Sequence, residues 1–102
     1  MPKGYWIARV DVLDDDRYRS YIAANAVAFA KFGARFIVRS GPFKNPEGMA
    51  RARNVVIEFP SYEAAVACYE SPEYAAAMAL RKAYAQSDII IIGGYDGPQP
   101  GD

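Results

Sequence analysis

The sequence predicts a single α+β domain in which a four-stranded antiparallel sheet carries two helices on one face. The predicted elements alternate in the order β-α-β-β-α-β. Right-handed crossovers and short connections then place both helices on the same side of the sheet, which is the ferredoxin-like arrangement. A length of 102 residues leaves room for one domain. We expect it to occupy residues 1–95, followed by a flexible tail at residues 96–102 that is rich in Pro and Gly.

The first half of the chain contains three predicted strands and one helix. Residues 4–12 (GYWIARVDV), 34–40 and 53–59 are rich in aromatic and β-branched residues, which are typical of strands. Three aspartates at 14–16 favour the start of a helix, and Gly33 suits its end. Residues 41–52 contain Gly and Pro without any period and predict a long loop. A lid over a cavity and a simple mobile connection are equally consistent with it.

The second half of the chain contains one interrupted helix and the last strand. Ser61 is a suitable N-cap for this helix. Ser71 and Pro72 restart it, with Ser as the cap and Pro at the first helical position, and it continues to about Gln86. Residues 87–94 include four consecutive isoleucines, which predict a strand covered on both faces.

Composition excludes several classes of function. Twelve basic and twelve acidic residues give a formal net charge of zero, which argues against a nucleic-acid partner. The sequence has no apolar run of about 20 residues and no signal-peptide profile, so we expect no membrane partner and a cytoplasmic location. There is no histidine, which removes Ser-His-Asp and Cys-His nucleophiles and most zinc or haem sites. We therefore expect no metal and no cofactor, and we interpret the single cysteine, Cys68, as a core residue.

Side-chain alternation sorts the strand residues into two faces. The apolar set is expected to face the helices: Trp6, Ala8, Val10, Phe36, Val38, Val55, Ile57 and Phe59. The other set is mixed: Tyr5, Ile7, Arg9, Asp11, Arg35, Ile37, Arg39, Asn54, Val56 and Glu58. Water would contact the aliphatic members of the mixed face in a monomer. This predicts a homodimer formed sheet to sheet, with the charged groups enclosed in a cavity, although a monomer with a half-polar open sheet is the alternative.

Four segments, GYWIARVDV, RFIVRSGP, VVIEFPSYEAA and YESPEYAAAMALR, resemble the DUF1330 family of small bacterial proteins. The resemblance extends from Gly4 to about Tyr95. It implies a dimeric α/β barrel and therefore the same sheet-to-sheet dimer, but no established reaction. The superfamily that it implies includes cofactor-independent monooxygenases, dehydratases, isomerases and haem-degrading enzymes. The absence of histidine counts against those members that use one as a base or haem ligand.

Glu58 is the candidate catalytic residue. It lies mid-strand on the mixed face, where an enclosed carboxylate can act as a general base. Arg9 or Arg39 on the same face would then bind an anionic substrate or enolate. A salt bridge across the strands or across the dimer is the alternative role for Glu58. Tyr5 either donates a hydrogen bond to the ligand or packs at the edge of the interface.

Three helical residues complete the candidate binding site. Asn25 occupies an inward position of the first helix, as a cavity contact or as a core amide. Tyr74 and Arg81 are seven positions apart and so share one face of the last helix. Arg81 either reaches the mouth of the cavity or pairs with a carboxylate, while Tyr74 packs in the core.

Two hypotheses of function remain open from the sequence. In the first, the protein binds a small carboxylate- or carbonyl-bearing metabolite in the inter-sheet cavity and is a cofactor-independent enzyme with Glu58 as its base. In the second, it is a non-catalytic binding protein, or a structural dimer whose cavity charges form salt bridges. Three arginines (Arg9, Arg35 and Arg39) against Asp11 and Glu58 leave one positive charge in excess on the mixed face, which favours an anionic ligand.

Overall fold

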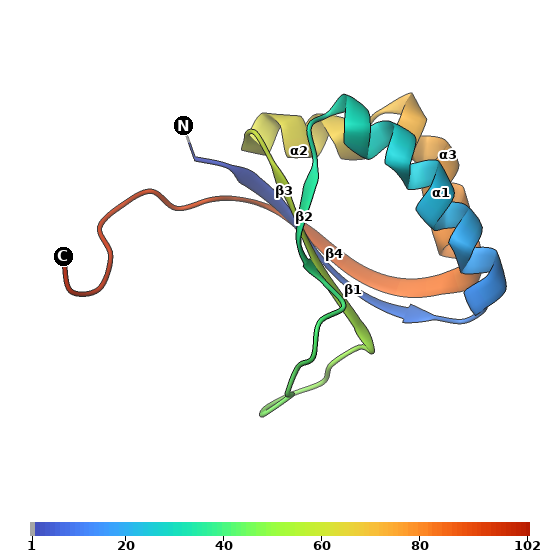
Figure 1. The fold of residues 1–102 in the computed structure, drawn as a ribbon, viewed down its shortest axis with the longest axis horizontal. Helices are drawn as coiled ribbons and strands as arrows, with labels where there is room; N and C mark the ends of the chain where they lie inside the picture. The colour runs from blue at the N-terminus through green and yellow to red at the C-terminus, as the bar shows by residue number, and fades with distance from the viewer. Residues whose placement is uncertain (1) are drawn as a thin grey trace.

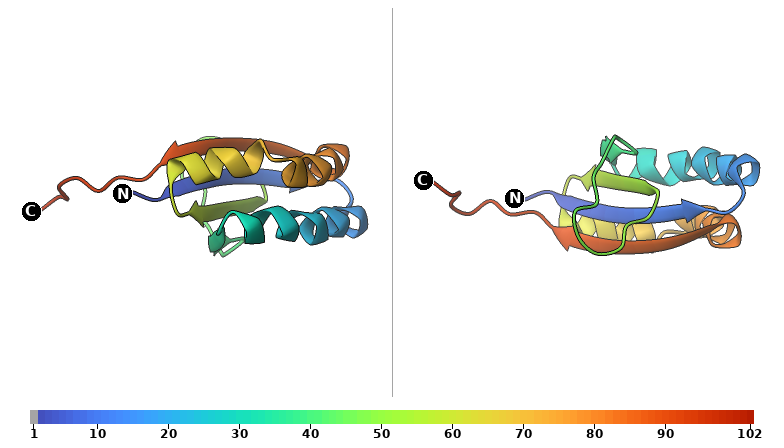
Figure 2. Two further views of the ribbon diagram at one scale, coloured as in Figure 1. Left: turned by 90° about the horizontal axis from the view of Figure 1, so that it is seen from above. Right: turned by 90° about the horizontal axis from the view of Figure 1, so that it is seen from below.

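The computed structural model describes residues 2–102 and confirms the predicted fold class. One antiparallel sheet has the strand order β2-β3-β1-β4, made of β1 (Gly4–Val12), β2 (Arg35–Arg39), β3 (Arg53–Phe59) and β4 (Ala85–Gly93). The helices are α1 (Asp15–Lys31), α2 (Tyr62–Tyr69) and α3 (Pro72–Tyr84). All three cover the same face of the sheet, with α1 beside the α2–α3 pair (Figures 1 and 2). The other face carries no helix, as Figure 1 shows.

Helix boundaries follow the capping residues in the sequence. Asp14 caps α1 by accepting a hydrogen bond from the Arg17 amide. Ser61 caps α2 and Ser71 caps α3, so the interrupted second helix is two separate helices. Helix α3 ends at Tyr84, about two residues earlier than expected, because Ala85 and Gln86 pair with β1 instead. The hydrogen bonds of that ladder outweigh the high helix propensity of alanine and glutamine at these two positions.

Trp6 is the centre of the core. Its side chain is 1% exposed, and its indole N–H donates to the Ala65 carbonyl at 2.8 Å. Four aromatic rings have centroids between 4.9 and 5.5 Å from its own: Phe29, Phe59, Tyr69 and Tyr74. These rings come from α1, β3, α2 and α3, so one indole connects the sheet to every helix. Aromatic contacts of this kind add to the free energy gained from burial alone.

Strand β2 contains a β-bulge that changes which face two of its residues occupy. Phe36 lies opposite Ile57, but Val38 lies opposite Val56 and Arg39 opposite Val55. The extra residue shifts the alternation by one position. Val38 is therefore on the open face and Arg39 is on the helix side, so both assignments made from strict alternation were wrong. Phe36 keeps its predicted place and packs edge-on against Phe29 of α1.

The face opposite the helices retains exposed aliphatic side chains. They are between 37% and 55% exposed: Ile7, Ile37, Val38, Ile90 and Ile92. On β4 itself, Ile89 and Ile91 pack against the core while Ile90 and Ile92 are open, so a single chain covers only one face of this strand. The loop between β2 and β3 projects from the same open side (Figures 1 and 2). Among residues 2–102, no helix is long and apolar enough to cross a membrane.

Candidate functional site

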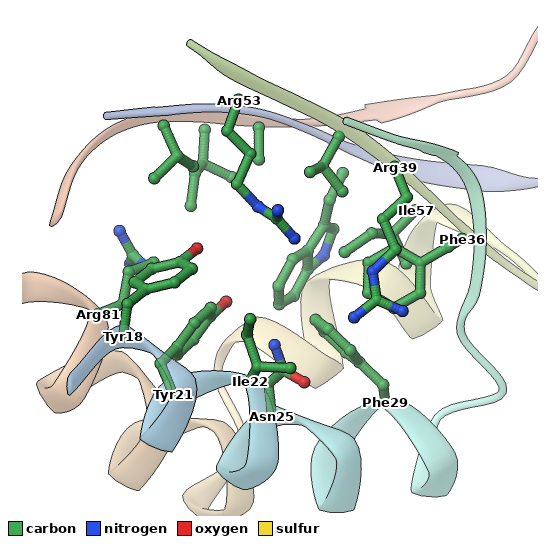
Figure 3. A pocket seen from close by; sticks show the side chains of 15 residues that line it. Tyr18, Tyr21, Ile22, Asn25, Phe29, Phe36, Arg39, Arg53, Ile57 and Arg81 are labelled. Carbon is green, nitrogen blue, oxygen red and sulfur yellow. The ribbon is translucent and has the colours of Figure 1, made fainter. Parts of the chain in front are cut away.

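A pocket lies between α1 and the helix-facing side of the sheet (Figure 3). Its cavity volume is about 30 Å³, room for a few water molecules. A larger ligand is therefore seated only when side chains around the open mouth move apart. Nine of its lining residues are apolar: Trp6, Ala8, Val10, Ile22, Phe29, Phe36, Val55, Ile57 and Ile89. The other six are polar or charged: Tyr18, Tyr21, Asn25, Arg39, Arg53 and Arg81. We call this the helix–sheet pocket; it contains three arginines and no acidic residue.

The three arginines of the helix–sheet pocket lack carboxylate partners. Arg81 is only 6% exposed. Arg53 extends from β3 over the Tyr18 ring, and Arg39 stacks on Phe36 with its guanidinium carbon 4.0 Å from the ring centroid. Within residues 2–102, none of the three forms an ion pair with Asp or Glu. A concave, partly apolar site with one sign of charge concentrates a positive potential.

Two buried tyrosine hydroxyl groups lie next to Arg81. The Nε of Arg81 donates a hydrogen bond to the Tyr74 hydroxyl at 3.3 Å, and the hydroxyls of Tyr74 and Tyr21 are 2.7 Å apart. Burial raises the pKa of Tyr21 and of Tyr74 above the ordinary value of 10.0. Both phenols are therefore neutral at pH 7. They give Arg81 a hydrogen-bond partner but no negative charge.

The structure brings four of the seven sequence candidates together. Asn25 and Arg81 line the helix–sheet pocket, and Tyr74 lies directly behind Arg81. Arg39 joins them because the bulge turns it to the helix side. Tyr74 is fully buried in the core, as the sequence predicts. For Arg81 the sequence left two roles open, and the structure places it in the pocket rather than in an ion pair with a carboxylate.

Sequence reasoning missed Arg53, and it did not identify Tyr18 or Tyr21 as site residues. Arg53 is the first residue of β3 and shares a face with Val55. Because side chains alternate along a strand, the residue two positions before Val55 lies on the same face, and this rule identifies Arg53. Tyr18 and Tyr21 occupy the buried side of α1, where an aromatic residue ordinarily indicates core.

The remaining candidates lie on the open face, and they do not form one cluster. The Tyr5 hydroxyl donates to Glu58 Oε2 at 3.4 Å, and Glu58 also lies opposite Arg35. Arg9 lies farther along β1, opposite Asn54, with Nη2 3.5 Å from Asp88 Oδ2. Glu58 and the helix–sheet pocket are on opposite sides of the sheet.

Arg51 neutralises the carboxylates at the Arg9 end of the open face. Its Nη1 lies 2.9 Å from Asp11 Oδ2, and its Nε lies 2.8 Å from Asp88 Oδ2. The hydrogen bond from Arg51 lowers the pKa of Asp88, while the Ala52 amide and Arg51 lower that of Asp11. These contacts, with that from Arg9 to the Met49 carbonyl at 3.2 Å, hold the end of the β2–β3 loop against the sheet.

The charges on the open face are therefore balanced. Its arginines are Arg9, Arg35 and Arg51, and its carboxylates are Asp11, Glu58 and Asp88. The predicted positive excess on this face was wrong, because Arg39 leaves the face and Asp88 and Arg51 join it. The excess positive charge lies in the helix–sheet pocket instead.

Cys68 and the acidic side chains form no nucleophile or metal centre within residues 2–102. Cys68 is fully buried, and burial raises the pKa of its thiol to about 12, so it carries no nucleophilic thiolate at neutral pH. In the part of the chain that the structure describes, no three His, Cys, Asp or Glu side chains are grouped as metal ligands.

Residues 3–95 match the family model described as "Domain of unknown function (DUF1330)". The chain belongs to the DUF1330 family. The resemblance seen in the sequence is thus confirmed over nearly the whole chain. Among curated proteins, none matches this DUF1330 member.

Solved structures with the same fold include proteins with and without an assigned activity. A protein of unknown function from Rhodopseudomonas palustris is 16% identical, with 94% of this chain and 85% of that one covered and a TM-score of 0.72. A dimeric ferredoxin-like protein of unknown function from Thermobifida fusca is 15% identical, with 90% and 91% covered and a TM-score of 0.61. SnoaB, a cofactor-independent oxygenase from Streptomyces nogalater, is 14% identical, with 95% and 97% covered and a TM-score of 0.63. At these identities, the likeness of the DUF1330 chain to them establishes the fold alone.

Proposed function

We propose that this protein binds a small carboxylate-bearing metabolite in the helix–sheet pocket, with Arg81 and Arg53 as the groups that contact the acid. The supporting observation is Arg81, which is 6% exposed, lines the pocket and has no carboxylate partner within residues 2–102. A buried charge without a counter-ion is strongly destabilising. A ligand carboxylate in the pocket supplies that counter-ion.

The chemistry of the pocket favours a carboxylate joined to a flat apolar body. The planar guanidinium of arginine donates two parallel hydrogen bonds to a carboxylate. Phe29 and Phe36 lie edge to face with centroids 5.8 Å apart and form an aromatic wall. Such a wall suits a ring or an unsaturated chain. A polarised carbonyl is the weaker candidate, because it leaves the charge of Arg81 uncompensated.

An enzyme that uses Glu58 as its base is the second candidate. Glu58 accepts a hydrogen bond from Tyr5 and lies opposite Arg35 on the open face. A cofactor-independent oxygenase has the same fold, which is consistent with chemistry of this class. This proposal requires a second copy of the chain to enclose the open face. It also separates catalysis from the helix–sheet pocket, since the sheet lies between them.

Thermal unfolding with benzoate and short aliphatic carboxylates tests binding. At a ligand concentration a hundred times its dissociation constant, the free energy of unfolding should rise by about 2.7 kcal/mol. Arg53→Ala should weaken binding about tenfold or more, since a charge-assisted hydrogen bond is lost. Arg19→Ala removes an equal charge from the exposed side of α1 and is the matched control.

Two results would contradict the proposed function. If no carboxylate in the series stabilises the protein, the helix–sheet pocket is not an acid-binding site. If Arg53→Ala and Arg19→Ala respond alike, the acid binds elsewhere.

A further inference from the structure

We propose that the ligand of the helix–sheet pocket carries two acid groups, one at each end of an apolar body. This inference rests on the proposed function and specifies the class of its ligand. Three arginines line the pocket, and none of them forms an ion pair with Asp or Glu within residues 2–102. One carboxylate neutralises only one of those charges, whereas a dicarboxylate neutralises two. The buried charge of Arg81 favours one acid group, and the two more exposed arginines near the mouth leave a positive charge for a second.

The arginines are arranged along the pocket rather than at one point. In Figure 3, Arg81 and Arg39 lie at opposite sides of the pocket, and Arg53 reaches in between them from the sheet. The apolar side chain of Ile22 lies between these two ends, and Phe29 lies on the side of Arg39. A ligand that meets both ends must therefore present acid groups at both of its own ends, with an apolar segment between them.

Arg39 is held at its end by the structure of β2. The bulge turns it to the helix side, opposite Val55. Its guanidinium then stacks on Phe36 at 4.0 Å, and Phe36 packs against Phe29. A stacked guanidinium has its planar group oriented before a ligand arrives, so less conformational entropy is lost on binding. Arg39 is also exposed, so its role is at the mouth of the pocket, while Arg81 is at the buried end.

Calorimetric titration with benzoate and benzene-1,4-dicarboxylate tests the inference. The two acids share one ring and differ by one acid group. The dicarboxylate should bind the wild type about tenfold more tightly than benzoate, a factor that one good charge-assisted contact provides. In Arg39→Ala, this advantage should fall to about twofold or less, while the affinity for benzoate changes less than about threefold. Arg39→Lys keeps the charge and should retain part of the advantage, and Arg19→Ala should retain all of it.

Two results would overturn the inference. Equal affinities for the two acids in the wild type would show that the pocket takes a monoacid, with the proposed function left intact. An advantage that persists in Arg39→Ala would place the second acid group elsewhere. Failure of benzoate itself to bind would instead contradict the proposed function, so the two failures are distinguishable.

Discussion

The buried hydroxyl groups of Tyr21 and Tyr74 should make the protein less stable at alkaline pH. Both side chains are buried, and burial raises the pKa of each above 10.0. The unfolded chain then releases these protons at a lower pH than the folded chain does. Their contribution to stability is fully present below about pH 10 and is lost as the pH rises further, at a rate that approaches about 1.4 kcal/mol per pH unit for Tyr21.

Tyr21→Phe tests this dependence. The variant should lose about 1 kcal/mol at pH 7, because the Tyr74 hydroxyl loses its 2.7 Å partner. Above pH 10 its free energy of unfolding should decline less steeply than that of the wild type, since one raised pKa is gone. Urea unfolding between pH 7 and pH 11 measures both effects. Tyr62→Phe, at an exposed position, is the control. An equal slope in Tyr21→Phe and the wild type would show that the burial of Tyr21 does not cause the loss of stability.

Individual site residues were predictable only where regular geometry applies. Asn25 and Arg81 follow helical periodicity, and both line the pocket as inward positions should. Arg39 follows period-two alternation only as far as the bulge, so its face was assigned incorrectly. A bulge depends on how two strands pair, and neither strand alone contains that information.

At the scale of elements, Ser71 is where two short helices join. Its hydroxyl donates to the Cys68 carbonyl at 2.7 Å and accepts from the Tyr74 amide at 3.1 Å. One side chain therefore provides a hydrogen-bond partner both for a carbonyl in the last turn of α2 and for an amide in the first turn of α3. Because the side chain is 6% exposed, water cannot replace it there.

Ser71→Ala should therefore destabilise the protein by about 2 kcal/mol, the upper end of the range for an N-cap. In a domain of this size, that corresponds to a fall in Tm of roughly 10 °C. Ser20→Ala, which alters an exposed serine of α1, should change the Tm by no more than about 2 °C. Calorimetry of the three proteins measures this, and a Ser71→Ala variant as stable as Ser20→Ala would contradict the cap assignment.

Elements were more predictable than residues because their signals are local and repeated. The caps at Asp14, Ser61 and Ser71 all lie where the sequence indicated helix starts. The end of α3 was less predictable, since the helix gives way to pairing between β4 and β1. That competition involves segments more than 70 residues apart, which no short window of sequence contains.

At the scale of the whole molecule, the open face of the sheet predicts a homodimer. Its strands expose Ile7, Ile37, Val38, Ile90 and Ile92, and no helix covers this side of the sheet within residues 2–102. A chain of this size buries only about 60–70% of its unfolded surface, so a second copy adds useful burial. A stable interface of this kind should exceed about 1,000 Å².

Ile90→Asp tests the dimer. Ile90 is 55% exposed in the single chain, so the substitution should do little to a monomer. In a sheet-to-sheet dimer it places an unpaired carboxylate in the interface and should weaken association at least a hundredfold. Val27→Asp, at a 62% exposed position on α1, should leave the dimer intact. Sedimentation measures both; a wild type that is monomeric at micromolar concentration would refute the prediction.

The acid-binding site that we propose lies between α1 and the sheet rather than between two sheets. A crystal structure of the protein with benzoate tests it directly. The benzoate carboxylate should lie within about 3.2 Å of Arg53 or Arg81, with the ring beside Phe29. Benzoate bound against Arg9, Arg35 or Glu58 on the open face, with the helix–sheet pocket empty, would contradict it.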